Sequence, residues 1–307
     1  HAQFRLDSGT NVGTAISPRT AGIAQMTNFE MDTSVDPIAV GRNTYFPIPK
    51  GKFSGVREFF LPDSGGSVPL SEDVTASIPR FIPSNLCSFT SCVAEDAIVV
   101  ISKDQPKRIY LYKFFFEEDT KLQSAWSYWE VKGDNRKILG GGVKGSDLFV
   151  LIEYKDGVYV EKVSLRPEQI DEGTEIEVLL DRKATTSEIS AMQLINAGGL
   201  GVETTIFLPY RIEANDDIVV VGKYEEGNTL LRHGQVIEPT SQTNLTITVP
   251  GDLKTTVDGK TPSFFVGNRY DMTYEFSTPY IKEQPSGGGV VLAAGPKLQM
   301  RTWTVIF

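Results

Sequence analysis

The stretch Ala97-Ile-Val-Val-Ile-Ser-Lys-Asp-Gln-Pro-Lys-Arg-Ile-Tyr-Leu-Tyr112 contains two apolar runs separated by a charged, proline-containing turn. β-Branched and aromatic residues fill both runs, and such residues favour strands over helices. Phe114, Phe115 and Phe116 follow closely, so apolar side chains occupy both strand parities instead of alternating with polar ones. We therefore expect a β-hairpin in a sheet whose two faces are both covered.

Two other segments share this layout of apolar strand, charged turn with Gly or Pro, and aromatic-rich strand. The three segments comprise Asn43–Phe46 with Val56–Phe60, Ala97–Ile101 with Arg108–Tyr112, and Asp147–Ile152 with Val158–Lys162. They recur roughly every 50 residues, an interval found in propeller-blade repeats. A blade lies between its neighbours and buries both faces, which agrees with the composition of the strands.

The fold predicted from these patterns is all-β. Residues 1–167 are expected to form an incomplete β-propeller, and residues 168–307 a β-sandwich or barrel-like domain, with the boundary near Pro167 where the repeat ends. The alternative is a generic β-sandwich whose strand spacing imitates a repeat. Each end of the chain is predicted to lie in a strand, so we expect an internal piece of a longer protein.

The second half contains apolar strand candidates separated by polar loops. The predicted strands are Glu175–Leu180, Val202–Leu208, Ile218–Tyr224, Leu245–Val249, Tyr270–Phe276 and Leu298–Ile306. The best alternation lies in Tyr270–Phe276, where Met272, Tyr274 and Phe276 share one face and polar residues the other. This pattern predicts a half-buried strand.

Charge and cysteine content exclude several classes of protein. The net charge is -9, from 30 basic and 39 acidic residues without a basic block, so strong phosphate binding to nucleic acid is not expected. Cys87 and Cys92 are too few for a disulfide framework and lack the spacing of a metal site, which indicates structural thiols. No apolar run is long enough for a membrane span, so stable membrane insertion is not expected.

The motifs of most enzyme classes are missing. The sequence has two histidines, His1 and His233, and no Gly-x-Ser-x-Gly elbow that would present a nucleophile. Gly140–Gly145 matches Gly-x-Gly-x-x-Gly, but a strand is predicted after it instead of the helix that binds a dinucleotide pyrophosphate. We therefore predict a protein without catalytic activity, cofactor or metal.

Acidic pairs are the remaining candidates for chemistry. They are Glu117-Glu118-Asp119, Asp216-Asp217 and Glu225-Glu226. Paired carboxylates can serve a glycosidase, but adjacent residues on a strand or turn point in different directions. Solvated turns are therefore the favoured interpretation.

Several ordered motifs resemble the tail nozzle proteins, or tail tubular proteins B, of short-tailed, podovirus-type bacteriophages. The motifs are Asp73–Pro79 with Phe81–Pro83, Lys107–Lys113, Gln123–Trp129, Asp156–Glu161, and Tyr274–Ser277 with Leu298–Trp303. They span nearly the whole chain, but little is recognisable between about Thr185 and Ser263. Family members are much longer and carry propeller-like and β-sandwich or barrel-like domains, which is consistent with the predicted fold.

The resemblance implies a structural role in the virion tail, assembled in the bacterial host cytoplasm. It implies a self-associated ring, commonly a hexamer, below the head-to-tail adaptor and in contact with tail fibres, through which DNA leaves without specific binding. An acidic lumen would not retain DNA phosphates. We accordingly expect Asp216, Asp217, Glu225 and Glu226 to face the lumen or its gate.

Two other functions remain open at this stage. One is a tail-borne module that hydrolyses glycans with an acidic pair. The other is a glycan-binding module in which Trp126 and Trp129 stack on sugar. For these tryptophans we favour core packing, because large aromatic side chains in strand-like segments mostly pack.

Overall fold

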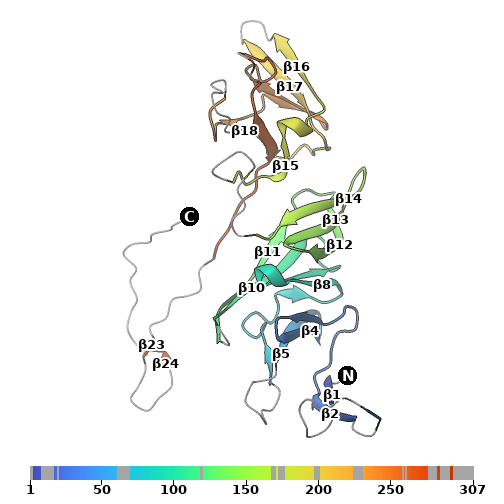
Figure 1. Ribbon diagram of the computed structural model, residues 1–307. Helices are drawn as coiled ribbons and strands as arrows, with labels where there is room; N and C mark the ends of the chain where they lie inside the picture. Colours follow the sequence, from blue (N-terminus) through green and yellow to red (C-terminus); the bar gives the residue numbers. More distant parts are fainter. Residues whose placement is uncertain are drawn as a thin grey trace.

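The computed structural model describes most of the first half of the chain and much of the second. The described residues are 3–7, 17–18, 21–60, 70–117, 120–166, 171, 177–196, 201–223, 231–257, 259, 261–275, 282–283 and 291–292. These residues form strands, turns and loops, with two short 3-10 turns. The prediction of an all-β chain is confirmed (Figure 1).

The elements of the first half extend to residue 164. They are β1 Gln3–Asp7, β2 Gly22–Thr27, β3 Ile38–Val40, β4 Asn43–Lys50, β5 Phe53–Phe60, β6 Leu70–Asp73, β7 Ile82–Pro83, β8 Leu86–Cys92, η1 Val93–Glu95, β9 Ala97–Ser102, β10 Arg108–Glu117, β11 Thr120–Glu130, β12 Lys137–Lys144, β13 Asp147–Tyr154 and β14 Gly157–Ser164.

The elements of the second half begin at residue 181. They are β15 Asp181–Thr185, η2 Thr186–Glu188, β16 Ala191–Asn196, β17 Val202–Phe207, β18 Ile218–Gly222, β19 Val236–Ile237, β20 Ser241–Gln242, β21 Thr246–Pro250, β22 Phe264–Asn268, β23 Lys282–Glu283 and β24 Val291–Leu292.

After the two-stranded β1-β2 sheet, three larger antiparallel sheets follow one another in the first half, and they are numbered here from the first of these three. The first sheet has the order β3-β4-β5-β6, with β7 paired to β5; the second has the order β11-β10-β9-β8; and the third has the order β12-β13-β14. Each of the three predicted hairpins is found: β4–β5, β9–β10 and β13–β14. The repeat pattern identified these central hairpins but missed the flanking strands β3, β8, β11 and β12.

The second sheet is covered on both faces, as its apolar content predicted. All six residues of β9 are buried. Ile98 and Val100 pack with Tyr45 of the first sheet, whereas Val99 and Ile101 pack in the core shared with the third sheet. Alternate residues of one strand therefore supply two different cores, because successive side chains point to opposite faces.

The three sheets meet along one edge. β8 lies against β3 of the first sheet and against β12 of the third. Glycine permits the close approach at β12, since a Cβ on Gly141 would lie 3.0 Å from the Phe149 carbonyl oxygen and 3.1 Å from Ile101 Cδ1. Gly140–Gly142 thus lies within strand β12. As expected from the sequence, a strand and not a helix follows this glycine motif, so the motif lacks the helix that a dinucleotide site needs.

Two four-stranded sheets make up the core of the second half. Their orders are β15-β22-β18-β19 and β16-β17-β21-β20. They share one apolar core, in which Val220 and Phe264 of one sheet pack with Ile206 and Ile247 of the other. Each side chain is fully buried.

Predicted strands of the second half match the structure unevenly. Those at 202–208, 218–224 and 245–249 correspond to β17, β18 and β21. The strand predicted at Tyr270–Phe276 is wrong for described residues 270–275, which form no strand and expose 84% of Met272 and 68% of Tyr274. Described residues 177–180 likewise form no strand. The strand predicted at Leu298–Ile306 lies outside the described residues.

Candidate functional site

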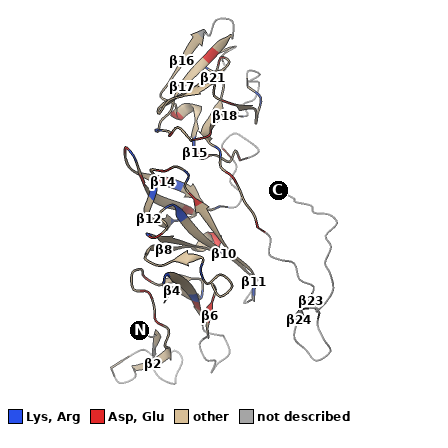
Figure 2. Cartoon of the chain, turned by 180° about the vertical axis from the view of Figure 1, so that it is seen from behind, with Lys and Arg blue, Asp and Glu red and all other residues tan. Residues whose placement is uncertain are grey.

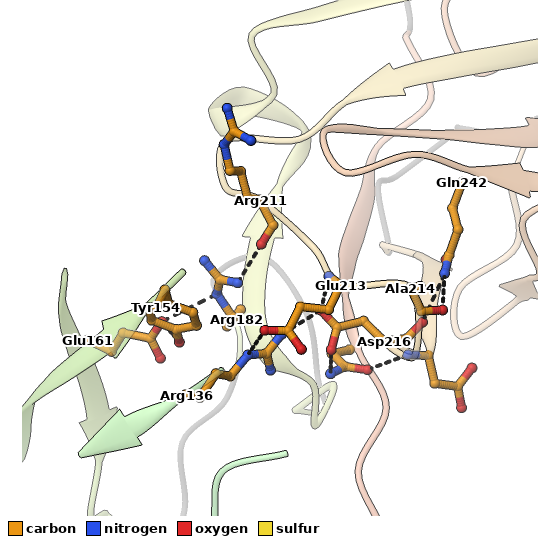
Figure 3. A network of polar contacts seen from close by, with 11 residues as sticks. Arg136, Tyr154, Glu161, Arg182, Arg211, Glu213, Ala214, Asp216 and Gln242 are labelled. Carbon is orange, nitrogen blue, oxygen red and sulfur yellow. Dashed lines mark hydrogen bonds and ion pairs between the residues drawn. The ribbon is translucent and has the colours of Figure 1, made fainter. Parts of the chain in front are cut away.

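A buried ion pair joins the two halves of the chain. Arg136, in the loop between β11 and β12, donates through Nη2 to Asp216 Oδ2 at 2.5 Å (Figure 3). The two side chains retain only 4% and 5% of their exposed area. Asp216 belongs to the loop that precedes β18, so the contact spans 80 residues of sequence.

The loop that carries Asp216 is held by several further hydrogen bonds. Asp216 Oδ2 accepts from the Glu213 backbone N–H at 2.9 Å, and Asp216 Oδ1 accepts from Asn268 Nδ2 at 3.4 Å. Gln242 Nε2 donates to the carbonyl oxygens of Ala214 and Asp216 at 3.1 and 3.3 Å. The Asp216 carboxylate is therefore held by groups of its own half as well as by Arg136.

Arg136 also lies close to Glu213. Its Nε is 3.9 Å from Glu213 Oε1 and makes no hydrogen bond in the described part of the chain. Gly133, with a φ of +101°, lets the loop fold over this pair; a Cβ there would lie 3.0 Å from both Arg136 Nε and Glu213 Oε2. Any other residue would be strained at this φ and would crowd the guanidinium.

The contact between the two halves around Arg136 and Asp216 is called the joint below. A second arginine extends this joint on the side of β13 and β14. Arg182 Nε lies 3.3 Å from Glu161 Oε1, and its guanidinium carbon lies 4.6 Å from the centre of the Tyr154 ring and 4.1 Å from that of Tyr210. Its Nη1 donates to the Arg211 carbonyl oxygen at 2.8 Å. The arginine thus contacts both halves at once.

Tyr154 is the aromatic centre of the joint. Its hydroxyl donates to Glu161, and the Arg136 guanidinium carbon lies 5.4 Å from its ring centre. Burial, followed by the Glu161 carboxylate, raises the pKa of this phenol well above its ordinary value. The group stays neutral and acts as a hydrogen-bond donor and a surface for cations.

Two peripheral ion pairs complete the joint. Arg211 Nε lies 3.2 Å from Asp156 Oδ2, and Lys132 Nζ lies 2.9 Å from Asp271 Oδ2. Both join residues of the first half to residues of the second. Each involves exposed side chains, so each contributes less than the buried pair.

The predicted acidic residues have different surroundings. Asp216 is buried in the joint, whereas the Asp217 side chain is 56% exposed and faces Arg269. The two guanidinium hydrogen bonds from Arg269, at 2.9 and 3.0 Å, lower the pKa of Asp217. Glu225 and Glu226 lie outside the described residues. Exposure to a lumen is therefore untested for all four residues.

Sequence reasoning missed the arginines of the joint. Arg136 lies in a polar loop, and Arg182 stands at the start of a short strand, without any motif around them. Their partners are remote in sequence, so no local spacing could have identified them. The only available signal was a charged residue beside an apolar segment, which is common at surfaces.

The other predicted functional residues show no reactive arrangement. His233 is exposed in a turn. Cys87 and Cys92 are free thiols whose pKa values are raised by burial. Trp126 stacks on Tyr112 with ring centres 4.9 Å apart and donates from Nε1 to the Val74 carbonyl oxygen at 3.0 Å, which confirms its packing role.

No cluster of three potential metal-ligating residues occurs in the part of the chain that the structure describes. Among the described residues, no helix has the length and apolar character needed to cross a bilayer. Basic and acidic residues are interspersed over both halves (Figure 2).

Comparison with known proteins identifies the family. Residues 1–307 match the model of the bacteriophage nozzle protein family, and the chain belongs to that family. It is similar to tail tubular protein gp12 of Escherichia phage T7, with 27% identity over 184 residues, covering 59% of this chain and 22% of the relative. The chain is thus part of a structural component of the phage tail.

Proposed function

We propose that this chain forms part of the wall of a ring-shaped nozzle through which DNA leaves the virion. Membership of the nozzle family over residues 1–307 is the observation that carries the proposal. The ring would be built from copies of the protein, six in the expected case, below the head-to-tail adaptor and in contact with tail fibres. DNA would pass through it without specific binding.

The first half, residues 1–167, would contribute blades of an incomplete β-propeller. Supporting this, three successive antiparallel sheets share apolar cores and meet along β3, β8 and β12. Blades of a propeller meet in this way around a central axis. The second half, residues 168–307, would be the β-sandwich or barrel-like domain, supported by its two sheets on one core.

The outer face of the third sheet supports further blades. Leu139, Leu151, Val158 and Val160 remain between 39% and 66% exposed, although the opposite face of the same sheet is buried. Leu151 and Val160 are directly opposite each other on β13 and β14. We propose that a sheet supplied by sequence outside residues 1–307 covers this face. Exposed apolar area of this kind commonly marks an interaction surface.

We also propose that the lumen of the nozzle is lined by acidic residues. Asp217 is exposed, and Glu225 and Glu226 belong to the segment that follows β18, so these residues are the candidates for contact with passing DNA. Asp216 would instead support the loop that presents Asp217. Reversal of charge at Asp217, Glu225 and Glu226 should slow DNA ejection, because cations would retain phosphates. Unchanged ejection kinetics would refute this part.

Electron microscopy of the intact protein and of particles carrying it tests the nozzle itself. A closed ring with an axial channel, with this chain in its wall, is the expected result. A monomeric protein at the tip of a fibre would contradict the proposal. Glycan-array binding by that protein would then favour a glycan-binding module.

A further inference from the structure

The outer strand of the second sheet has an unusual free edge. Within the described residues β11 pairs only with β10. From Leu122 to Trp129 it contains no charge and no proline, and Leu122, Tyr128 and Trp129 are 51%, 44% and 36% exposed. Natural sheets generally protect such edges with charges, proline or a covering segment. This edge is therefore suited to pairing with a further strand.

A candidate strand begins beside the end of β11. After β22 the chain leads toward the side of the molecule that carries the β10–β11 hairpin (Figure 1). Asp271 Oδ2 forms its 2.9 Å ion pair with Lys132 Nζ, two residues beyond the end of β11. From that point the segment runs away from the two sheets of the second half (Figure 1), so its direction is antiparallel to β11.

Residues 270–275 carry the alternation of a strand without forming one. Tyr270, Met272 and Tyr274 share one parity and are 40%, 84% and 68% exposed. Asp271 and Glu275 share the other parity with Thr273. A segment with one apolar face normally buries that face against a sheet. Among the described residues, no strand pairs with residues 270–275.

The ion pair suggests a register, and the register selects which faces would meet. With Asp271 opposite Lys132 in an antiparallel pairing, Met272 is opposite Val131 and Tyr274 is opposite Trp129. Val131 already packs against the core between the second and third sheets, and Trp129 is opposite Ile109 of that core. A shift of two residues would leave the faces unchanged, because side chains alternate with a period of two.

The polar face also has complementary charge. In the same register Thr273 is opposite Glu130 and Glu275 is opposite Tyr128. Arg108 lies on this side, with its guanidinium carbon 4.3 Å from the Tyr128 ring centre and Nε 2.7 Å from Glu130 Oε2. Glu275 would therefore lie near a cation, while Met272 and Tyr274 lie on the apolar side.

We propose that residues 270–275 dock on β11 of the same chain as a fifth, antiparallel strand of the second sheet. Docking supplies backbone partners to the free edge and a cover for Trp129 and Val131, with an aromatic pair between Tyr274 and Trp129. It also connects the end of the second half to the sheet stack of the first half. The Asp271–Lys132 pair sets the register.

Cysteine cross-linking of the full chain tests the register. The test variant carries Glu130→Cys with Thr273→Cys, and the matched control carries Glu130→Cys with Met272→Cys, whose side chain points to the other face. All three positions are exposed, so both variants should fold. Under mild oxidation the test variant should form at least about fivefold more disulfide, because directly opposite Cβ atoms are close enough to be bridged.

Electrophoresis without reductant and mass spectrometry of the linked peptides distinguish the outcomes. A cross-linked monomer supports docking within one chain. A cross-linked dimer would overturn this assignment and indicate strand exchange between copies. Equal cross-linking in test and control would overturn the register. Cys87 and Cys92 should contribute little background, because burial raises their thiol pKa values.

Hydrogen exchange gives a second test without introduced cysteines. Amides of β11 that point to the free edge should exchange at least about tenfold more slowly in the unmodified chain than in a Thr273→Pro variant, because proline cannot take part fully in a ladder. Amides of β9 should be unaffected and serve as the internal control. Identical rates along β11 in the two proteins would refute docking.

Discussion

The core between the second and third sheets and the joint between the two halves lie side by side, yet they are built differently. The core consists of apolar residues such as Ile101, Leu148 and Val150. The joint consists of buried charges, chiefly Arg136 and Asp216, with Tyr154 contributing to both regions. Apolar burial is strong but not directional, whereas an ion pair is satisfied in few orientations. We therefore expect the core to stabilise the stack and the joint to restrict the angle between the halves.

Removal of the joint's buried cation should have the largest effect. Arg136→Ala leaves Asp216 buried with only neutral partners, and the expected loss is about 3–5 kcal/mol of unfolding free energy. Chemical denaturation of the full chain measures it. Asp216→Asn is the comparison, because it retains hydrogen-bonding capacity, and the double variant should cost less than the sum of the single ones. A loss under about 1 kcal/mol for Arg136→Ala would contradict a buried joint.

Truncation within the apolar core should be the next largest effect. Leu148→Ala should cost about 2–5 kcal/mol, since Leu148 is fully buried between the second and third sheets. Ile247→Ala is its match in the core of the second half, where Ile247 is equally buried. Calorimetry of each variant and of their combination should give additive losses, because the two cores share no residues. Strong coupling would show that the halves do not have separate cores.

Acid should weaken a contact inside the first sheet by a smaller amount. Burial opposes ionisation of Asp73, but hydrogen bonds from Lys50, at 2.6 Å, and from Thr75 lower its pKa below the ordinary value of 3.8. Because the folded-state pKa is the lower one, this stabilisation is present above pH 3.8 and is lost as the pH falls below it. Lys50→Gln should flatten the dependence of the unfolding free energy on pH in that range. An unchanged dependence would show that other groups cause the acid sensitivity.

An exposed ion cluster should have the smallest effect. Arg269 contacts Asp217 and Glu238 at 2.9 Å, with all three side chains about half exposed. Arg269→Ala should cost no more than about 1 kcal/mol, with a smaller cost at high salt because solvent screens such pairs. Thermal unfolding at low and high salt measures it. A cost equal to that of Arg136→Ala would show that burial does not distinguish the two sites.

The amino-acid sequence by itself determined the all-β class, the three central hairpins and the covering of β9 on both faces. These follow from local pattern: β-branched and aromatic runs form strands, and apolar residues in both parities require two packed faces. The sequence alone also showed that common catalytic motifs do not occur, because such motifs depend on residue identity. The family match agrees with that result.

Only the tertiary structure decided which charges are buried and which strands have partners. Asp216 and Asp217 are neighbours in sequence, but one enters the joint and the other remains exposed, since the contact with Arg136 forms across 80 residues. The alternation at 270–275 predicted a strand. Alternation shows that a segment could bury one face in a sheet, but a strand forms only where a neighbouring strand provides hydrogen-bond partners. Long-range contacts determine both outcomes, and no local spacing encodes them.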